Sequence, residues 1–290
     1  MSIDDRDRGG SLEQVPAGDP RLEPYRSLRD PDLVRAGEGE GWFIGEQALV
    51  LERMLARRGT TISILASRRM APRAVEIRRA SADPEVPILV AEDPVIESLV
   101  GFELHRGLLA LGRRPEDGRA RIDAALADRS RPVALLACEE IRNIDNIGLL
   151  FRNAAAFGVA GVLLSPGCHD PLYRKSLRVS IGHALDVPFA RLDDLAGDLR
   201  AMREREGVAL LGTATDPGAV AVHRLEPPRR FVLLVGSEFP GLSPAAKAAC
   251  DRLVRIPMAR GVDSLNVGVA AAACLSHLRG DLLEADRSTT

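Results

Sequence analysis

The sequence predicts an α/β protein with two domains, of which the second has a parallel sheet covered by helices on both faces. Short apolar runs alternate with helical patterns along most of the 290 residues, and such dense alternation is typical of parallel sheets. Two late apolar runs, 231–235 and 253–256, each end in a glycine-bearing loop that leads into a helix. Because ligands bind at the carboxyl ends of strands in open α/β sheets, these loops predict a pocket for a small polar molecule.

Composition and charge narrow the class of protein. Hydrophobic residues make up 46% of the chain and aromatic residues 3%, so the expected cores are aliphatic and rich in alanine. The net charge is −2, which provides no overall basic field to attract a nucleic acid. Every basic residue except Lys175 and Lys247 is arginine, which binds phosphate and stacks on bases well, so RNA binding through local patches stays open.

The cysteines, the histidines and the N-terminus bear on metal binding, on disulfides and on the cellular location of the protein. The four cysteines form no CxxC pair and the five histidines are scattered, so we expect no metal site and no disulfide framework. Cys274 lies in an apolar helical pattern and is expected in the core. The chain lacks a signal-peptide apolar segment, and no apolar run approaches ~18 residues, so we expect a cytoplasmic protein without a membrane partner.

The first domain is expected at residues 21–112. Residues 1–20 are rich in Asp, Arg, Gly and Pro and predict a disordered tail. Residues 113–131 carry many charges and predict a linker, with one or two helical turns at 122–126. Between tail and linker, the patterns predict helices at 46–58, 71–80 and 95–100 and strands at 61–65, 86–90 and 107–111.

The second domain is expected at residues 132–290. Its patterns predict strands at 133–137, 162–165, 187–190, 208–213, 231–235 and 253–256, and helices at 145–157, 171–183, 192–205 and from 264 onward. In the first of these helices, apolar side chains recur at i, i+3, i+4, i+7 and i+8, which is one buried face. Asp145 or Asn146 is expected to cap its start and Gly158 to end it. Asn146 and Arg152 are expected to lie off the buried face.

Common catalytic and nucleotide-binding motifs do not occur in the chain. It contains no GxGxxG, no GxxxxGK[ST] and no GxSxG. This excludes a dinucleotide-binding Rossmann fingerprint, a P-loop and the nucleophile elbow of serine hydrolases.

Three other segments, in a fixed order across residues 133–278, carry a family resemblance. They are 146–148 with 152–154 and 157–158, then 236–238 with 241–243, and finally 256–258 with 264–267 before an alanine-rich helix. A stretch at 179–184 followed by Pro188 accompanies them. Together these segments resemble the motifs of the SpoU/TrmH-type family of RNA ribose 2′-O-methyltransferases, which belongs to the SPOUT class.

The resemblance implies the architecture and the partners of the protein. It implies a trefoil-knotted SPOUT methyltransferase domain at 132–290, although true knots are rare among protein chains. Segments 43–46 and 101–110 are similar to an L30e-like RNA substrate-binding domain, which implies that fold for residues 21–112. The family also implies a tRNA or rRNA partner and a homodimer formed through the methyltransferase domain.

The resemblance further implies S-adenosyl-L-methionine as cofactor. The residues expected around it are Thr213, Gly236, Ile256, Met258 and Leu265. Glycine-bearing loops allow backbone groups to approach an adenosine closely. For Ile256 and Met258, a plain role as core residues at a strand end is an equal alternative.

The resemblance assigns the acceptor side of the reaction to a second set of residues. They are Arg152, Asn146, Glu238, Ser264 and Asn266. Arg152 is expected to meet the RNA phosphate beside the target ribose and to stabilise the developing alkoxide. The family proposal that this arginine acts as a base conflicts with the reluctance of guanidinium to lose a proton.

The other four acceptor-side residues have expected roles of their own. Asn146 and Asn266 can bond ribose or backbone, and Ser264 can do the same or cap its helix. Glu238 is expected either to order the loops or to pair with Arg152.

One departure from the family pattern lies in the second motif. The family usually has glycine after the glutamate, whereas Phe239 and Pro240 follow Glu238 here. The phenylalanine could stack on a base or on the adenine, or only pack, so the departure bears on substrate preference more than on cofactor binding.

Three alternative functions stay open at this stage. The first is a non-catalytic RNA-binding protein of the same fold, against which the presence of all five acceptor-side residues argues. The second is a SPOUT enzyme that methylates an RNA base, and the third is a small-molecule α/β enzyme with an unrelated cofactor. The asparagine and arginine of the first motif favour ribose over base by analogy.

Overall fold

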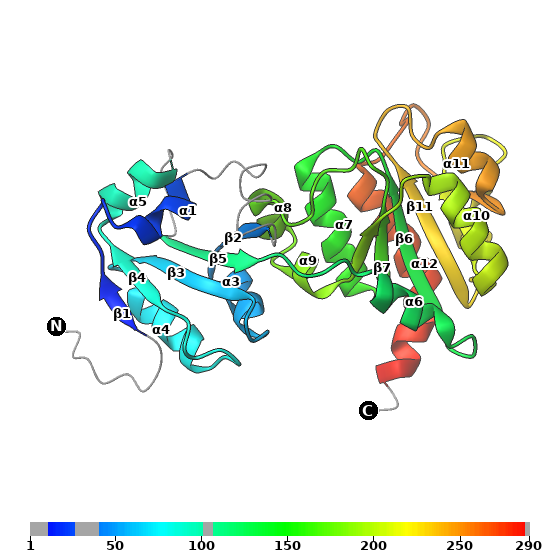
Figure 1. The fold of residues 1–290 in the computed structure, drawn as a ribbon. Helices are drawn as coiled ribbons and strands as arrows, with labels where there is room; N and C mark the ends of the chain where they lie inside the picture. Colours follow the sequence, from blue (N-terminus) through cyan, green and yellow to red (C-terminus); the bar gives the residue numbers. More distant parts are fainter. Residues whose placement is uncertain (1–10, 27–40, 101–106, 288–290) are drawn as a thin grey trace. The chain divides into compact units, whose positions relative to one another are not determined.

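The computed structural model describes residues 11–26, 41–100 and 107–287, and its contacts divide the chain into two units. The first unit is Met1–Glu116 with Leu172–Leu185, and the second is Asp117–Pro171 with Asp186–Thr290. Figure 1 labels their elements. The break at 116–117 falls within the predicted linker, whereas the inclusion of 172–185 in the first unit is a feature that the sequence patterns did not indicate.

The first unit contains a five-stranded mixed sheet in the order β1-β4-β3-β5-β2. The strands are β1 (Leu12–Gln14), β2 (Trp42–Glu46), β3 (Thr61–Ser67), β4 (Ile88–Ala91) and β5 (Leu108–Arg113). Strand β5 runs antiparallel to both β3 and β2, and the remaining pairs are parallel. The helices are η1 (Pro20–Leu22), α1 (Glu23–Arg26), α3 (Ala48–Leu55), α4 (Ala71–Arg79), α5 (Asp93–Val100) and α8 (Arg174–Val179).

Part of the predicted disordered tail is ordered. Strand β1 pairs with β4 in parallel, with Leu12 opposite Ile88, and Leu22 and Tyr25, which follow the predicted tail, are fully buried. The Tyr25 hydroxyl lies 3.0 Å from the carbonyl oxygen of Ser63, to which it donates. Backbone pairing and this buried anchor outweigh the polar composition of the segment. Residues 1–10 and 101–106, which carry the rest of the tail and part of the L30e-like match, lie outside the described residues.

The second unit contains a seven-stranded sheet in the order β10-β12-β9-β11-β6-β7-β8, with every pair parallel. The parallel α/β class predicted for this domain is therefore confirmed. The strands are β6 (Val133–Glu139), β7 (Gly161–Leu164), β8 (Phe189–Arg191), β9 (Ala209–Thr213), β10 (Val220–Ala221), β11 (Arg230–Gly236) and β12 (Arg252–Arg255).

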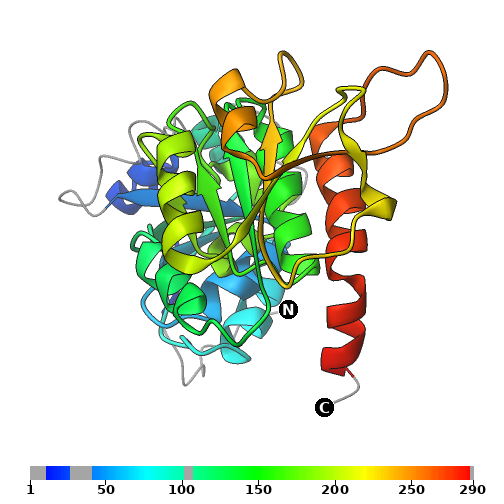
Figure 2. The ribbon, with the colours of Figure 1, turned by 90° about the vertical axis from the view of Figure 1, so that its right-hand side faces the viewer.

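Helices cover both faces of this parallel sheet. They are α6 (Arg119–Ala127), α7 (Ile144–Ala156), α10 (Leu195–Glu206), α11 (Pro244–Ala249) and α12 (Val267–Arg287), with the short η2 (Val222–Arg224) in a connection. The short helix α9 (His183–Asp186) stands in the sequence where the chain passes from the first unit to the second. Buried residues of α6, α10 and α11 share one apolar core with alternate residues of β6, β9 and β11. Figure 2 shows α7 and α12 on the opposite face, where the two helices pack together.

Helix α6 corrects the predicted linker. It lies inside 113–131, and its Ile122 and Leu126 are fully buried in the core of the second unit. Just before it, the Gly118 amide donates to the Phe189 carbonyl at 2.9 Å. Two apolar side chains one turn apart thus anchor a segment whose many charges favoured a linker.

The start of α7 differs from the prediction in two respects. Its cap is Asn143, whose side-chain oxygen accepts from the amides of Asp145 at 2.9 Å and Asn146 at 3.3 Å. Asn146 is only 4% exposed, although it was expected to lie off the buried face. It can be buried because its side chain has polar partners. Arg152 is exposed, as predicted.

Candidate active site

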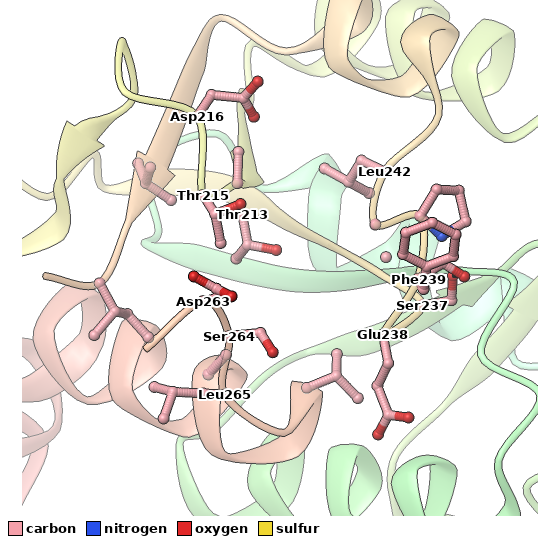
Figure 3. Close-up of a pocket in the computed structure, with 18 of the residues that line it drawn as sticks. Thr213, Thr215, Asp216, Ser237, Glu238, Phe239, Leu242, Asp263, Ser264 and Leu265 are labelled. Carbon is pink, nitrogen blue, oxygen red and sulfur yellow. The ribbon is translucent and has the colours of Figure 1, made fainter. Parts of the chain in front are cut away.

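A hollow of about 400 Å³ lies where β9, β11 and β12 end. Its lining comes mostly from the loops after β9 and β11 and the loop that leads into α12 (Figure 3). The volume is in the range of ordinary small-molecule sites. The strand-end pocket predicted from the two glycine-bearing loops therefore exists in the structure.

All five residues predicted to surround a cofactor line this first hollow. They are Thr213, Gly236, Ile256, Met258 and Leu265. Ile256 and Met258 are half-buried rather than enclosed in the core. Cys274 is fully buried as predicted, and it also forms part of the wall.

Gly236 lies at the tightest point of the first hollow. A side-chain carbon added there would overlap the backbone of Gly241 and Leu242. The loop after β11 therefore folds back directly over the end of its own strand. Such a close turn requires glycine and leaves backbone rather than side chains at this wall.

A second hollow, of about 510 Å³, adjoins the first. Its walls are the segment 140–143 after β6, Asn146 at the start of α7, and the loop 237–240. The same four loop residues, Ser237 to Pro240, also line the first hollow. The loop after β11 is thus a partition with one hollow on either side.

A chain of hydrogen bonds connects the three predicted motifs beside this partition. Asn146 Nδ2 donates to Glu238 Oε1 at 2.9 Å, and Asn266 Nδ2 donates to Asn146 Oδ1 at 2.8 Å. The remaining Asn266 oxygen accepts from the backbone amides of Gly268 at 2.9 Å and Val269 at 3.3 Å. Asn266 therefore caps α12, and the alternative that Ser264 caps it is wrong. Because each amide end has a fixed partner, the orientation of the buried Asn146 side chain is determined.

The other predicted acceptor-side residues occupy different places. Glu238 bonds Asn146, so the first of its two expected roles, ordering the loops, agrees with the structure and the pairing with Arg152 does not occur. Ser264 lines the first hollow. Arg152 is exposed on α7, lines neither hollow, and has no hydrogen bond or ion pair within the described part of the chain.

Three contributing residues were not singled out from the sequence. Glu139, the last residue of β6, accepts from the amide and the hydroxyl of Ser243, both at 2.7 Å, and so holds the start of α11. Asn153 donates to the Gly268 carbonyl at 2.7 Å and links α7 to α12. Arg142 lines the second hollow. Glu139 and Arg142 lie two and five positions after the end of the strand predicted at 133–137, near the carboxyl end where ligands bind in such sheets.

Local electrostatics at the second hollow involve Arg142 and Glu140. They form an ion pair at 2.8 Å. The Arg142 hydrogen bond is the largest influence on Glu140, and it lowers the pKa of that carboxyl below its ordinary value. The Arg142 side chain nevertheless is 79% exposed, and a surface pair of this kind contributes little to stability. Its guanidinium is therefore available to an anion.

Two structural findings bear on other kinds of site. In the ranges 11–26, 41–100 and 107–287, no helix combines the length and apolar character needed to cross a membrane. Across the same described positions, His, Cys, Asp and Glu side chains form no group of three that could hold a metal ion.

The sequence matches a known family and several named proteins. Residues 134–276 match the SpoU rRNA Methylase family. The chain is 42% identical over 265 residues to a Mycobacterium tuberculosis protein named uncharacterized tRNA/rRNA methyltransferase, covering 88% of this chain and 86% of that one. It is 33% identical over 172 residues to the 23S rRNA (guanosine-2′-O-)-methyltransferase RlmB of Vibrio cholerae, covering 59% of this chain and 68% of that one.

The fold also matches solved structures. An AdoMet-bound rRNA methyltransferase from Sinorhizobium meliloti superposes with a TM-score of 0.74 at 22% identity, over 94% of this chain and 99% of the other. The SpoU methyltransferase AviRb from Streptomyces viridochromogenes, in complex with AdoMet, gives 0.73 at 23% identity, over 91% and 98%. At these identities the likeness concerns the fold.

Fold and site together define a parallel α/β protein with adjoining ligand hollows at the carboxyl ends of its strands. The chain belongs to the SpoU rRNA methylase family. The family predicted from the three sequence motifs is thereby confirmed.

Proposed function

We propose that the protein transfers a methyl group from S-adenosyl-L-methionine to a ribose 2′-hydroxyl of tRNA or rRNA. The observation that carries this proposal is the Asn266–Asn146–Glu238 chain, which connects all three family motifs beside two adjoining hollows. One hollow would hold the donor and the other the acceptor nucleotide. The names of the relatives in Mycobacterium and Vibrio agree with this reaction and with RNA as substrate.

The first hollow has the chemistry that the cofactor requires. Leu242, Ile256 and Leu265 offer apolar surface to an adenine, and the close backbone turn at Gly236 leaves peptide groups at the wall. Asp263 and Glu238 place carboxylates in the lining, and carboxylates attract a cationic ligand. When bound, S-adenosylmethionine supplies a methyl group on a positively charged sulfur.

The chain's own residues act on the acceptor by positioning it. The Asn146–Glu238 pair is fixed by the bonds described above, and it can hold a ribose hydroxyl at the partition between the hollows. Holding two reactants in line lowers the barrier without further chemistry from the protein. Arg152 lies outside both hollows, so it would bind a phosphate of the RNA beside the target ribose, and its positive charge would favour the negative charge that develops on the hydroxyl oxygen. Its guanidinium keeps its protons throughout.

The decisive experiment measures methyl transfer from labelled S-adenosylmethionine to unmodified tRNA and rRNA transcripts, with nucleoside mass spectrometry of the products. We expect a 2′-O-methylnucleoside from one RNA class, and a loss of at least about 100-fold in the Arg152→Ala variant. Because Arg152 is exposed, that variant should keep its melting temperature and its cofactor affinity. A methyl group located on the base would favour the base-methylating alternative. Absence of both transfer and cofactor binding would favour an RNA-binding protein.

We further infer that the protein acts as a homodimer through its second unit. Val262, Leu265 and Val269 are apolar side chains that remain exposed around the start of α12, and a second copy is the partner that the family implies. Light scattering at micromolar concentration should give twice the mass of one chain. A monomer would contradict the proposal, as would unchanged dimerisation after Val269→Asp.

We also propose the detailed architecture of the two units, on the basis of the resemblance to the family. The second unit would contain a trefoil knot, and the first unit would be an L30e-like arm that binds the RNA substrate in the cytoplasm. Pulling the chain from both termini should leave a fully stretched length shorter than the contour of 290 residues, because a knot tightens rather than opens. A full contour length would exclude the knot.

A further inference from the structure

Phe239 is the most exposed large apolar side chain of the described residues. It is 92% exposed, whereas the others with high exposure lie between 39% and 53%. It belongs to the partition loop and lines both hollows. Isolated apolar residues are common on protein surfaces, but an aromatic ring in water at the edge of a binding site presents two open faces for stacking.

The geometry indicates which hollow the ring serves. The first hollow already has aliphatic walls from Leu242, Ile256 and Leu265, and a ring packed against them would have lost most of its exposure. Phe239 is the only aromatic ring among the described lining residues of either hollow, and the second hollow lacks the aliphatic walls of the first.

The second hollow combines three chemistries that match one nucleotide. Arg142 offers an exposed guanidinium, which suits a phosphate and would exchange its surface pair with Glu140 of the same hollow for that phosphate. The Asn146–Glu238 pair offers amide and carboxylate groups, which suit a ribose hydroxyl. Phe239 offers an apolar aromatic face, which suits a base. All of these groups belong to the second unit, so their arrangement does not depend on the first.

We propose that Phe239 stacks on the base of the acceptor nucleotide and so holds that nucleotide, turned out of its strand, over the partition between the hollows. This inference rests on the proposed methyl transfer to RNA and adds the way in which the acceptor is bound. Proteins that recognise RNA loops or single strands commonly stack splayed bases on aromatic side chains. Every base has a π-face, so the stack selects an unpaired nucleotide rather than one particular base.

Three substitutions of Phe239 distinguish an effect of base stacking from an effect of side-chain volume. Phe239→Ala removes the ring, Phe239→Leu keeps an apolar side chain without a π-face, and Phe239→Trp keeps a larger π-face. We expect the first two to raise KM for the RNA substrate roughly 5- to 150-fold, the range found when a stacking aromatic is truncated. Phe239→Trp should retain the affinity of the wild-type protein. The dissociation constant for S-adenosylmethionine and the melting temperature should not change in any of them.

The same series contains the results that would overturn the inference. An unchanged KM in Phe239→Ala, or full activity in Phe239→Leu, would show that stacking is not used. A weaker S-adenosylmethionine affinity with an unchanged KM for RNA would place the ring on the adenine of the cofactor instead.

A binding measurement distinguishes this inference from failure of the proposed function. In a Trp42→Phe background, which removes the single native tryptophan, the fluorescence of the Phe239→Trp variant should be quenched by a 23S rRNA transcript or by unmodified tRNA. Quenching without methyl transfer in the wild-type protein would contradict the proposed reaction and leave stacking in place. Methyl transfer without quenching would contradict stacking alone, and absence of both would reject the two proposals together.

Discussion

Asn146 is the residue on which the geometry of the candidate site depends most. It is nearly fully buried, receives a hydrogen bond from Asn266, and donates one to Glu238. A buried polar group with both ends bonded is costly to alter, because any partner left unpaired loses its solvation without compensation.

The first prediction concerns this asparagine. Asn146→Asp would place a second carboxylate against Glu238 where an amide now donates at 2.9 Å. The lost charge-assisted bond and the new repulsion should lower kcat/KM for RNA by about 10- to 100-fold at neutral pH. Nucleoside mass spectrometry of the methylated RNA measures this loss.

Asn146→Ala is the matched control for that change. The alanine variant removes the bond without adding charge, so it should retain more activity than the aspartate variant. Equal activities of wild-type and aspartate variants would show that the Asn146–Glu238 pair has no role in positioning the acceptor.

The second prediction concerns the thiols. Burial raises the pKa of all four cysteines above the ordinary value, to about 12 for Cys250 and about 11 for Cys274. Only the thiolate reacts with alkylating agents. At pH 8 iodoacetamide should therefore label native protein much more slowly than free cysteine, and label all four residues in urea. Rapid labelling of native Cys250, detected by peptide mass spectrometry, would contradict this.

The same thiols make stability depend on alkaline pH. Their pKa values are higher in the folded than in the unfolded chain, so above about pH 9 the folded state retains protons that the unfolded state releases. Their contribution is complete below that pH and is lost as the pH rises further.

The sequence predicted the position of the candidate site correctly because ligands bind at the carboxyl ends of parallel strands. The two glycine-bearing loops predicted a pocket, and the five residues that the family resemblance placed around a cofactor all line it. Sequence reasoning failed for Asn146, whose burial and partners come from residues about 90 and 120 positions away. No local pattern in the sequence indicates contacts between residues so far apart along the chain. The same limit explains why Glu238 was given two alternatives.

The loop after β11 is the element that determines the shape of both hollows. It closes over Gly236, is held at its far end by the Glu139–Ser243 bonds, and forms the partition. A helix cap and a glycine turn therefore hold the loop that separates the two hollows.

The third prediction tests this element. Gly236→Ala should force the loop away from the end of β11, because the added carbon would overlap backbone that cannot rotate aside. We expect a loss of about 1–3 kcal/mol in the free energy of unfolding and a weaker cofactor affinity by at least tenfold in calorimetry.

A second glycine provides the control for the third prediction. A side-chain carbon at Gly218 meets nothing within 4 Å, so Gly218→Ala should leave both quantities nearly unchanged. If the Gly236 variant bound the cofactor as tightly as the wild-type protein, the close turn would have no role in that site.

At the scale of elements, periodicity identified the long helices and the central strands, and short or polar elements were missed. Strands β1, β2 and β10 did not stand out, and α6 was assigned to the linker. Two buried residues hold α6 in place, which is too few to give a clear helical pattern among charged neighbours. The observed cap of α7, Asn143, lies two or three positions before the predicted Asp145 or Asn146, as is common for helix ends.

For the whole molecule, the net charge of −2 means that attraction to RNA must come from local groups rather than from the overall field. Arg142 and Arg152 are exposed arginines of the second unit that the proposals place on phosphates.

The fourth prediction follows from this dependence of RNA binding on local arginines. Raising the salt concentration from 50 to 200 mM should weaken RNA binding by roughly tenfold, the effect expected from two or three phosphate contacts to a single strand. Cofactor affinity should change little over the same range. Filter binding measures the first quantity and calorimetry the second, and RNA affinity independent of salt would argue against phosphate contacts.

The class of the whole fold was predictable, and the strand order was not. Alternation of strands and helices indicated the parallel sheet, which the structure confirms. The position of β11 between β6 and β9 depends on long crossovers, and many orders are compatible with one pattern of alternation. Family likeness, rather than periodicity, indicated the finer architecture of both units.

The position of β11 in the sheet affects how the protein folds during its synthesis. One edge of β6 pairs with β7 soon after it is made, but the other edge waits for β11, nearly a hundred positions later. At cellular rates of synthesis that delay is on the order of ten seconds. Asn266 emerges later still. Throughout that interval the apolar edge of β6 has no native neighbour on that side, so the nascent chain should depend on chaperones more than its size suggests.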